Sequence, residues 1–260
     1  MNVMNHSILI FLHLPKSGGT TLKSVIERQY GSSCIYDIPK YKPREIEDTI
    51  KRKRNRLEVV MGHLGFGWHY LLDKPFKYIT MLRNPIERIV SLYYFSKKYE
   101  WQPYYELANS LSLEEFASIE SNREICNYQT ALLSGIVQAP TSTRELPQKK
   151  HLQEAIENLN THFINVGITE KFDESILLLQ DSLSWEMPFY RRLQVVADRP
   201  KIVDLNKRIL DTIKRNNELD LELYSWTKQK HNALVAKKGE EFEGRLARFR
   251  EANVAYEKSE

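Results

Sequence analysis

The chain has 260 residues, of which 42% are hydrophobic and 28% charged, a composition typical of a soluble globular protein. Its formal net charge of +4 does not require a nucleic-acid partner, and its two cysteines exclude a disulfide framework. No apolar run reaches the ~18 residues of a transmembrane helix, and "ILIFLHL" near the N-terminus lacks the basic flank and cleavage site of a signal peptide. We therefore expect a cytoplasmic protein without a transmembrane segment.

The first part of the chain alternates between strand and helix patterns. The continuous apolar run at residues 7–14 predicts a strand buried on both faces. Helical spacing follows at residues 20–30 and stops at Gly31. Further β-branched runs predict strands at residues 34–38, 56–63 and 76–83.

The rest of the chain is mainly helical around one more strand. Asn84 and Pro85 have the capping and first-turn preferences of a helix start. Residues 162–167 predict the last strand, and the following helices are expected at residues 170–183, 203–216 and 218–234, with a charged, frayed C-terminal helix or tail at about 228–260. The alternation predicts one α/β domain over residues 1–260, a P-loop-like three-layer sandwich with a central parallel sheet of about five strands flanked by helices.

The segment "LPKSGGTTL", residues 14–22, joins the first predicted strand to the first predicted helix. This arrangement directs backbone N–H groups at an anion. The loop supplies a cation, two glycines and three hydroxyl groups from Lys16, Ser17, Gly18, Gly19, Thr20 and Thr21. No strand ends in the aspartate pattern that holds magnesium in nucleoside triphosphatases. We predict a phosphate site that needs no metal, with an ordinary strand-to-helix turn as the alternative.

The second segment is "YITMLRNPIERIVSLYYF", residues 78–95. Arg83 ends a predicted strand, and Ser91 lies seven residues after Asn84, so the two share one face of the helix. The Arg83 guanidinium can lie along this face and share an anion with Ser91. A strand-end arginine and a helix serine without a ligand are the alternative.

The two segments together resemble the sulfotransferases. "LPKSGGTTL" is similar to their 5′-phosphosulfate loop. "LRNPIERIVSLYYF" is similar to their 3′-phosphate motif, especially in the heparan and uronosyl 2-O-sulfotransferases, of which the chain looks like a prokaryote-type soluble member. "VVMGHLGFG", "NYQTALLSG", "NVGITEKFDESILLL" and "NNELDLELY" resemble further family segments, while the similarity fades in residues 32–56 and 100–122 and after Trp226.

The resemblance implies transfer of a sulfuryl group from 3′-phosphoadenosine 5′-phosphosulfate to a hydroxyl of a saccharide or glycoconjugate, without a metal. The product would be 3′-phosphoadenosine 5′-phosphate. Lys16 would stabilise the leaving oxygen, and Ser17 would steady Lys16 or the phosphate. The implied phosphate ligands are Gly18, Gly19, Thr20 and Thr21 for the 5′-phosphate and Arg83 and Ser91 for the 3′-phosphate.

His63 is the candidate general base, because a histidine titrates near neutral pH and this one follows a strand-like run beside Gly62. A structural histidine at a strand end is the alternative. Related 2-O-sulfotransferases often read His-Gly-His here, whereas this chain has Met61-Gly62-His63, which weakens the case for a uronic-acid acceptor. His69 is a second acid-base candidate or a partly exposed loop histidine, and His13 is expected to order the first loop by hydrogen bonding.

Basic and aromatic clusters give the remaining expectations. "KRKRNR", residues 51–56, is predicted to be a solvated helix end, with an anionic partner as the alternative. The resemblance implies a basic loop closing over the cofactor, with Arg191, Arg192, Arg199 and Lys201 as candidates. The aromatic residues of 93–95 and 99–106 are core or a sugar-stacking cleft.

Two rival functions remain open. A small-molecule kinase with an atypical phosphate loop would need a metal-binding carboxylate near a strand end. A non-enzymatic nucleotide- or RNA-binding protein would use residues 51–56 and would leave Lys16 and His63 without a role. Binding of 3′-phosphoadenosine 5′-phosphate, compared with binding of ATP and magnesium, separates these possibilities.

Overall fold

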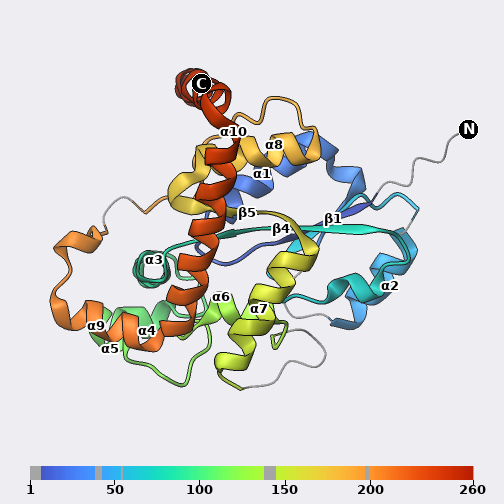
Figure 1. Ribbon diagram of the computed structural model, residues 1–260. Coiled ribbons are helices and arrows are strands. Elements are labelled where there is room, and N and C mark those ends of the chain that lie inside the picture. The colour runs from blue at the N-terminus through green and yellow to red at the C-terminus, as the bar shows by residue number, and fades with distance from the viewer. Residues whose placement is uncertain (1–6, 39–42, 54, 138–144, 197–198, 260) are drawn as a thin grey trace, which may run out of the picture.

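A computed structural model describes residues 7–38, 43–53, 55–137, 145–196 and 199–259 (Figure 1). Its centre is a parallel sheet in the order β2-β3-β1-β4-β5. The strands are β1 (Ile8–Leu12), β2 (Ile35–Asp37), β3 (Val59–Gly62), β4 (Phe76–Leu82) and β5 (Phe163–Ile168). The predicted α/β fold and its five strands are confirmed. The first four strands are slightly shorter than their apolar patterns, and the last is shifted by one residue toward the C-terminus.

Side chains of β1 alternate between two apolar layers, as the period of a strand requires. On one face, Ile8, Ile10 and Leu12 pack with α2 (Pro43–Lys53), α6 (Tyr128–Ser134) and α7 (Lys149–His162). On the other face, Leu9 and Phe11 pack with α1 (Gly19–Tyr30) and α8 (Phe172–Leu183). All five residues of β1 are buried, which explains why its sequence is continuously apolar.

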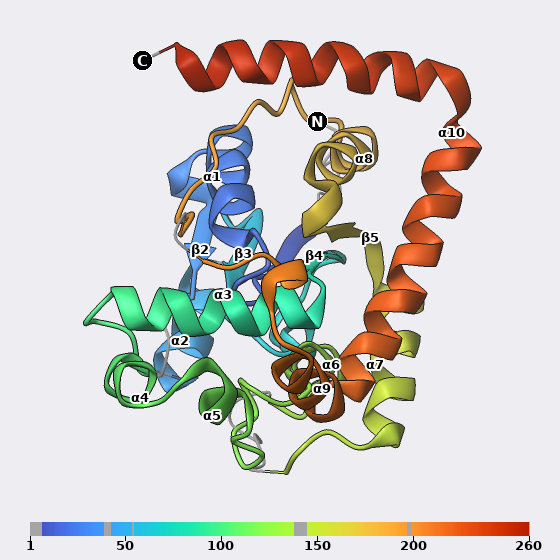
Figure 2. The same cartoon turned by 90° about the vertical axis from the view of Figure 1, so that its left-hand side faces the viewer.

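A third apolar cluster surrounds α3 (Pro85–Lys98), whose N-cap Asn84 accepts the backbone N–H of Ile86 as predicted. Its partners are α4 (Tyr105–Ser110), α5 (Leu113–Ala117) and α9 (Lys207–Asn216). Figure 2 shows α3 running beside the sheet with α4, α5 and α9 below it. Short 3-10 helices occur at Ser32–Cys34, Trp68–Leu71, Thr169–Lys171 and Ile202–Asp204.

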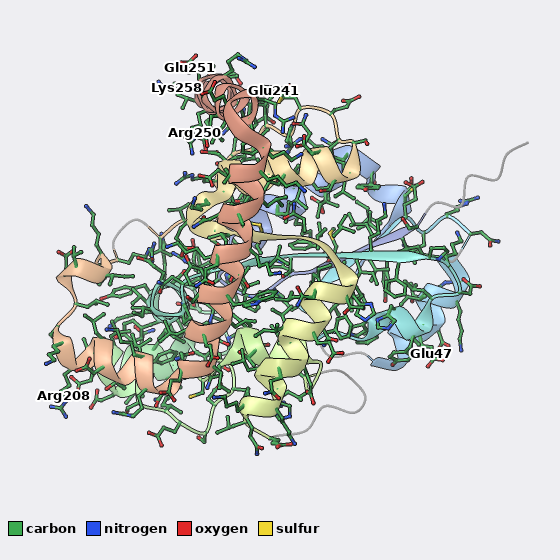
Figure 3. All side chains as sticks on the ribbon, in the orientation of Figure 1. Glu47, Arg208, Glu241, Arg250, Glu251 and Lys258 are labelled. Atoms are coloured by element: carbon green, nitrogen blue, oxygen red, sulfur yellow. The ribbon has the colours of Figure 1, made fainter. Side chains whose placement is uncertain are left out.

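The last helix, α10 (Glu218–Lys258), has two halves separated by a kink at Gly239. The second half crosses above α1 and α8 (Figure 2) and buries Phe242, Leu246 and Phe249 in their apolar layer. The predicted charged helix is confirmed, but its frayed end is wrong, because these three apolar residues hold it down. Figure 3 shows its charged side chains, such as Glu241, Glu251 and Lys258, at the edge of the molecule.

The end of α2 carries Lys51, Arg52 and Lys53, all exposed to solvent. Arg54 of the basic run lies outside the described residues. The solvated helix end predicted for this run is therefore confirmed for the three lysine and arginine positions of α2. No helix among the described residues is long and apolar enough to cross a membrane.

Candidate active site

The carboxyl ends of β1, β3 and β4 open into one cavity of about 560 Å³. Both sequence segments contribute to it, since parallel strands end at the same edge of a sheet. The residues predicted from the sequence to form the site that do line this cavity are Lys16, Gly18, Gly19, Thr20, Thr21, His63, Arg83, Ser91, Arg192 and Arg199. Residues far apart in the sequence are thus brought together in one hollow.

The loop after β1 turns sharply into α1. Lys16 and Gly18 both have left-handed backbone, with φ of 65° and 73°. Gly19 opens the helix directly against the His13 ring, which a Cβ at this position would overlap. A glycine is therefore required here by close approach rather than by its φ. The His13 ring lies against Gly19 of the loop, while its backbone N–H donates to the Gly62 carbonyl of β3 at 2.9 Å, so ordering of the loop by a hydrogen bond of the imidazole stays a prediction.

The hydroxyl groups of the loop differ in their surroundings. Ser17 is fully buried, and its Oγ has no hydrogen-bond partner among the described residues. Thr20 Oγ1 donates to Gln194 Oε1, and Thr21 Oγ1 accepts the Leu193 N–H, both at 3.1 Å. The segment around residue 193 therefore lies directly over the phosphate loop.

Lys16 places its ammonium 3.0 Å from the centre of the Phe95 ring. Burial, together with the positive charges of Arg83 and Arg199, lowers the pKa of Lys16 to about 7. The lysine is thus poised to gain a proton when an anion enters. The sequence left the aromatic residues of 93–95 open between core and a sugar-stacking cleft, and Phe95 is both buried and part of the cavity lining.

Arg83 lies between the two loops. Its Nη1 donates to the Lys16 carbonyl at 2.9 Å, and its Nη2 donates to Glu87 Oε2 at 3.0 Å. Arg199 donates to the same carboxylate oxygen at 2.6 Å. Burial is the main cause that lowers the pKa of Arg83, and the neighbouring positive charge of Arg199 adds to it. Ser91 is 8% exposed and also lines the cavity.

Glu87 and Gln129 were missed by the sequence reasoning. Glu87 lies one helical turn after Arg83, a spacing that signals an ion pair and that was available in the sequence. Gln129 accepts the Arg83 N–H at 2.9 Å and donates to the Arg83 carbonyl at 2.9 Å. Nothing in the sequence signals this contact, because it comes from α6, 46 residues away.

His63 is exposed at the cavity, and its ring lies 4.3 Å from that of His13. Its Nδ1 is 2.8 Å from the His13 carbonyl oxygen. A carbonyl only accepts, so Nδ1 carries the proton, and in the neutral ring Nε2 has the lone pair. This tautomer is the one that a general base at Nε2 requires.

His69 is not among the residues that line this cavity. Its ring packs on Phe76 and His162, with centroids 4.5 and 5.5 Å away, and its Nδ1 is 3.0 Å from the Tyr78 hydroxyl. Burial lowers the pKa of His69, and the nearby His162 adds to this effect. His69 therefore belongs to an aromatic cluster beside the sheet, as a structural residue.

The four basic candidates near residue 195 separate into two groups. Arg192 and Arg199 line the cavity. Arg191 instead lies over the Tyr256 ring of α10, with its guanidinium carbon 5.2 Å from the centroid. Lys201 is exposed and precedes the short helix at Ile202–Asp204. The loop that the resemblance implied thus places Arg192 and Arg199 toward the phosphate loop.

Comparison with known proteins gives the family of the chain. A family model described as galactose-3-O-sulfotransferase matches residues 30–258. The chain belongs to the galactose-3-O-sulfotransferase family. The predicted resemblance to carbohydrate sulfotransferases is therefore confirmed, while the closer likeness to 2-O-sulfotransferases and the prokaryote-type assignment stay predictions.

Individual relatives are distant. Galactose-3-O-sulfotransferase 3 of Bos taurus and that of Homo sapiens are each 24% identical over 238 residues, covering 84% of this chain and 55% of the relative. Heparan-sulfate 6-O-sulfotransferase 2 of Homo sapiens is 22% identical over 283 residues, covering 87% of this chain and 45% of the relative. The chain thus spans about half the length of these galactose-3-O- and heparan-sulfate 6-O-sulfotransferases.

A crystal structure of mouse sulfotransferase SULT7A1 complexed with PAP is also similar. It is 18% identical, covers 85% of this chain and 67% of its own, and has a TM-score of 0.39.

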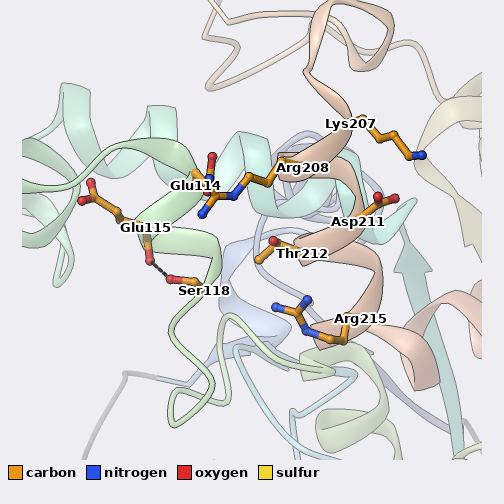
Figure 4. A pocket seen from close by; sticks show the side chains of 8 residues that line it. All are labelled: Glu114, Glu115, Ser118, Lys207, Arg208, Asp211, Thr212 and Arg215. Carbon is orange, nitrogen blue, oxygen red and sulfur yellow. Dashed lines mark hydrogen bonds and ion pairs between the residues drawn. The ribbon is translucent and has the colours of Figure 1, made fainter.

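A second hollow, of about 630 Å³, lies between α5 and α9, and Figure 4 shows its charged lining. Arg208 of α9 donates to Glu114 of α5 at 2.6 Å across it. None of the predicted phosphate-binding residues lines this hollow. Among the described residues, no group of three histidines, cysteines or carboxylates is arranged to hold a metal ion.

Proposed function

We propose that this chain transfers a sulfuryl group from 3′-phosphoadenosine 5′-phosphosulfate to a hydroxyl of a carbohydrate or glycoconjugate. The observation that carries the proposal is the single cavity that contains the loop of Lys16, the arginine Arg83 and the histidine His63. Family membership supports the same reaction. Cytoplasmic localisation stays a separate prediction.

The residues of the cavity fit a donor with two phosphate groups. Arg83 lines the cavity, and its Nε is a buried donor without a hydrogen-bond partner among the described residues, so an anion that reaches it satisfies this group. The start of α1 adds backbone N–H groups. Arg83 and Ser91 line the cavity from the other loop, where they would hold the 3′-phosphate.

Each step of the transfer has a residue assigned to it. His63 Nε2 accepts the proton of the acceptor hydroxyl, whose oxygen forms the new bond to sulfur. Lys16 donates a hydrogen bond to the bridging oxygen, which takes the electron pair of the breaking sulfur–oxygen bond. The donor supplies the activated sulfuryl group, and the bisphosphate leaves as product. No metal is required in this scheme, because Lys16, Arg83 and backbone N–H groups carry the charge.

Binding of 3′-phosphoadenosine 5′-phosphate and adenosine 5′-monophosphate to Arg83→Ala protein tests this assignment. A charge-assisted hydrogen bond contributes roughly 1.5–3 kcal/mol, so affinity for the bisphosphate should fall about ten- to a hundredfold. Affinity for the monophosphate should stay nearly unchanged. Isothermal calorimetry measures both.

Arg208→Ala is the matched control, since this arginine lies in the other hollow. It should leave both affinities intact. Equal losses for the two nucleotides in Arg83→Ala protein would contradict the 3′-phosphate assignment. Tight binding of ATP with magnesium, and none of the bisphosphate, would favour the kinase alternative.

A further inference from the structure

Trp101 is a large aromatic side chain left open at the mouth of the cavity. It lies on the connection between α3 and α4, lines the cavity and is 67% exposed. An indole that remains accessible at the rim of a ligand cavity offers its face to a bound molecule. Trp101 is not among the residues proposed to bind either phosphate group.

The indole is held in place by two other rings. Its centroid lies 5.7 Å from that of Phe95, edge-on, and 5.8 Å from that of Tyr99. Phe95 is 3% exposed and is itself the ring under the Lys16 ammonium. Trp101 is therefore one aromatic ring away from the lysine at which the sulfuryl group would be transferred.

The charges around the cavity are unevenly placed. Its lining cations are gathered around the phosphate loop: Lys16, Arg83, Arg192 and Arg199. Next to Trp101 in the sequence, the cavity lining continues with Gln102, Pro103 and Tyr104, which carry no positive charge. Such a wall favours an uncharged ligand with hydroxyl groups over an anionic one.

We propose that Trp101 is the stacking platform for an uncharged pyranose ring of the acceptor. This inference rests on the proposed sulfuryl transfer and assigns its acceptor subsite. The C–H face of the sugar lies on the indole, and the ring hydroxyls face the polar groups of the adjoining wall. One ring hydroxyl then extends past Phe95 toward Lys16 and His63.

The first test compares acceptors and variants in steady-state kinetics. The neutral acceptors are lactose, maltose and cellobiose, and the anionic one is a 6-O-desulfated heparin oligosaccharide. Trp101→Ala should raise the KM of the best neutral acceptor about tenfold, the usual scale of one well-stacked aromatic contact plus its burial. The KM of the donor should stay within about twofold, and Trp101→Phe should retain most of the wild-type behaviour.

Tyr70→Ala is the matched control, because Tyr70 is another exposed aromatic, 55% accessible, that does not line this cavity. It should change no KM. An unchanged acceptor KM in Trp101→Ala protein overturns the platform. A lower KM for the heparin oligosaccharide than for every neutral sugar overturns the proposal that the acceptor ring is uncharged.

A second measurement does not depend on turnover. Saturation-transfer NMR should show contact of the neutral disaccharides with wild-type protein loaded with 3′-phosphoadenosine 5′-phosphate, and loss of that contact in Trp101→Ala protein. Sugar contact without any transfer would refute the proposed reaction but support the subsite. Transfer that persists with equal contact in both proteins would refute the subsite alone.

Discussion

Lys16 combines strain and charge at one residue. Its backbone is left-handed, with φ of 65°, a conformation that costs a non-glycine residue free energy and recurs at functional sites. Its pKa falls from 10.5 to about 7. The unfolded chain therefore binds more protons than the folded one between these values, so this group destabilises the ligand-free fold below pH 7 and ceases to do so as the pH rises toward 10.5.

An anionic ligand should reverse the shift at Lys16, because a nearby negative charge favours the protonated amine. At pH 8.5, binding of 3′-phosphoadenosine 5′-phosphate should take up about one proton. Calorimetry in buffers of different ionisation enthalpy measures this uptake. Lys16→Met protein should lack it, and equal uptake in both proteins would show that another group titrates.

Glu87 keeps two guanidinium groups together at the same place. Arg83 and Arg199 both donate to its Oε2, at 3.0 and 2.6 Å. Without this carboxylate the two cations repel each other, and Arg199 loses its link to the start of α3. Glu87 is therefore a positioning residue. Its negative charge alone would weaken binding of an anionic ligand, but by holding the two arginines in place it should strengthen that binding.

Glu87→Gln should weaken binding of 3′-phosphoadenosine 5′-phosphate about tenfold, or ~1.4 kcal/mol, although a negative charge has been removed. Tighter binding would mean that only the charge matters. Glu114→Gln is the matched control, since Glu114 pairs with Arg208 in the hollow between α5 and α9. The control should leave the affinity unchanged.

At the scale of elements, sequence patterns over a few residues predicted the strands and the start of a helix. The five strands followed from their apolar runs, and the start of α3 from Asn84 and Pro85. Helix geometry alone predicts that Asn84 and Ser91 share a face, and Arg83 and Ser91 both line the cavity. The contact of Arg199 with Glu87 spans 112 residues and depends on tertiary packing, so no local pattern could reveal it.

The kink of α10 also lay beyond sequence reasoning. Gly239 has φ of 67° and ψ of −162°, a region that is essentially restricted to glycine. The charge pattern around it continues on a helical period and masks the break. The kink redirects the second half of α10 so that Phe242 and Phe249 reach the layer formed by α1 and α8.

Gly239→Ala should destabilise the protein by about 1–3 kcal/mol, because alanine disfavours this backbone conformation. A steric clash does not contribute, since a Cβ at this position meets no atom within 4 Å. This loss corresponds to a Tm decrease of roughly 2–10 °C. Gly244→Ala, in the helical part of α10, should be neutral or stabilising, since alanine favours a helix by about 1 kcal/mol over glycine. Calorimetric scans of both variants measure the difference, and similar changes in Tm would rule out a strained kink.

At the scale of the whole molecule, the end of α10 is connected to the phosphate loop. Asn253 Oδ1 accepts the Tyr190 N–H at 2.8 Å, and Glu257 accepts the Arg192 N–H at 3.2 Å. The same segment then reaches Thr21 through Leu193. The second half of α10 therefore supports the segment that covers the candidate donor site, although it is far from the phosphate loop in the sequence.

The most direct test of the proposed reaction is transfer of labelled sulfuryl from 3′-phosphoadenosine 5′-phosphosulfate to a saccharide, with a chelator present. Wild-type protein should form labelled saccharide, and His63→Ala protein should bind the bisphosphate normally but turn over about 10²-fold or more slowly. Absence of labelled saccharide with wild-type protein, across neutral and anionic acceptors, would contradict the proposed function.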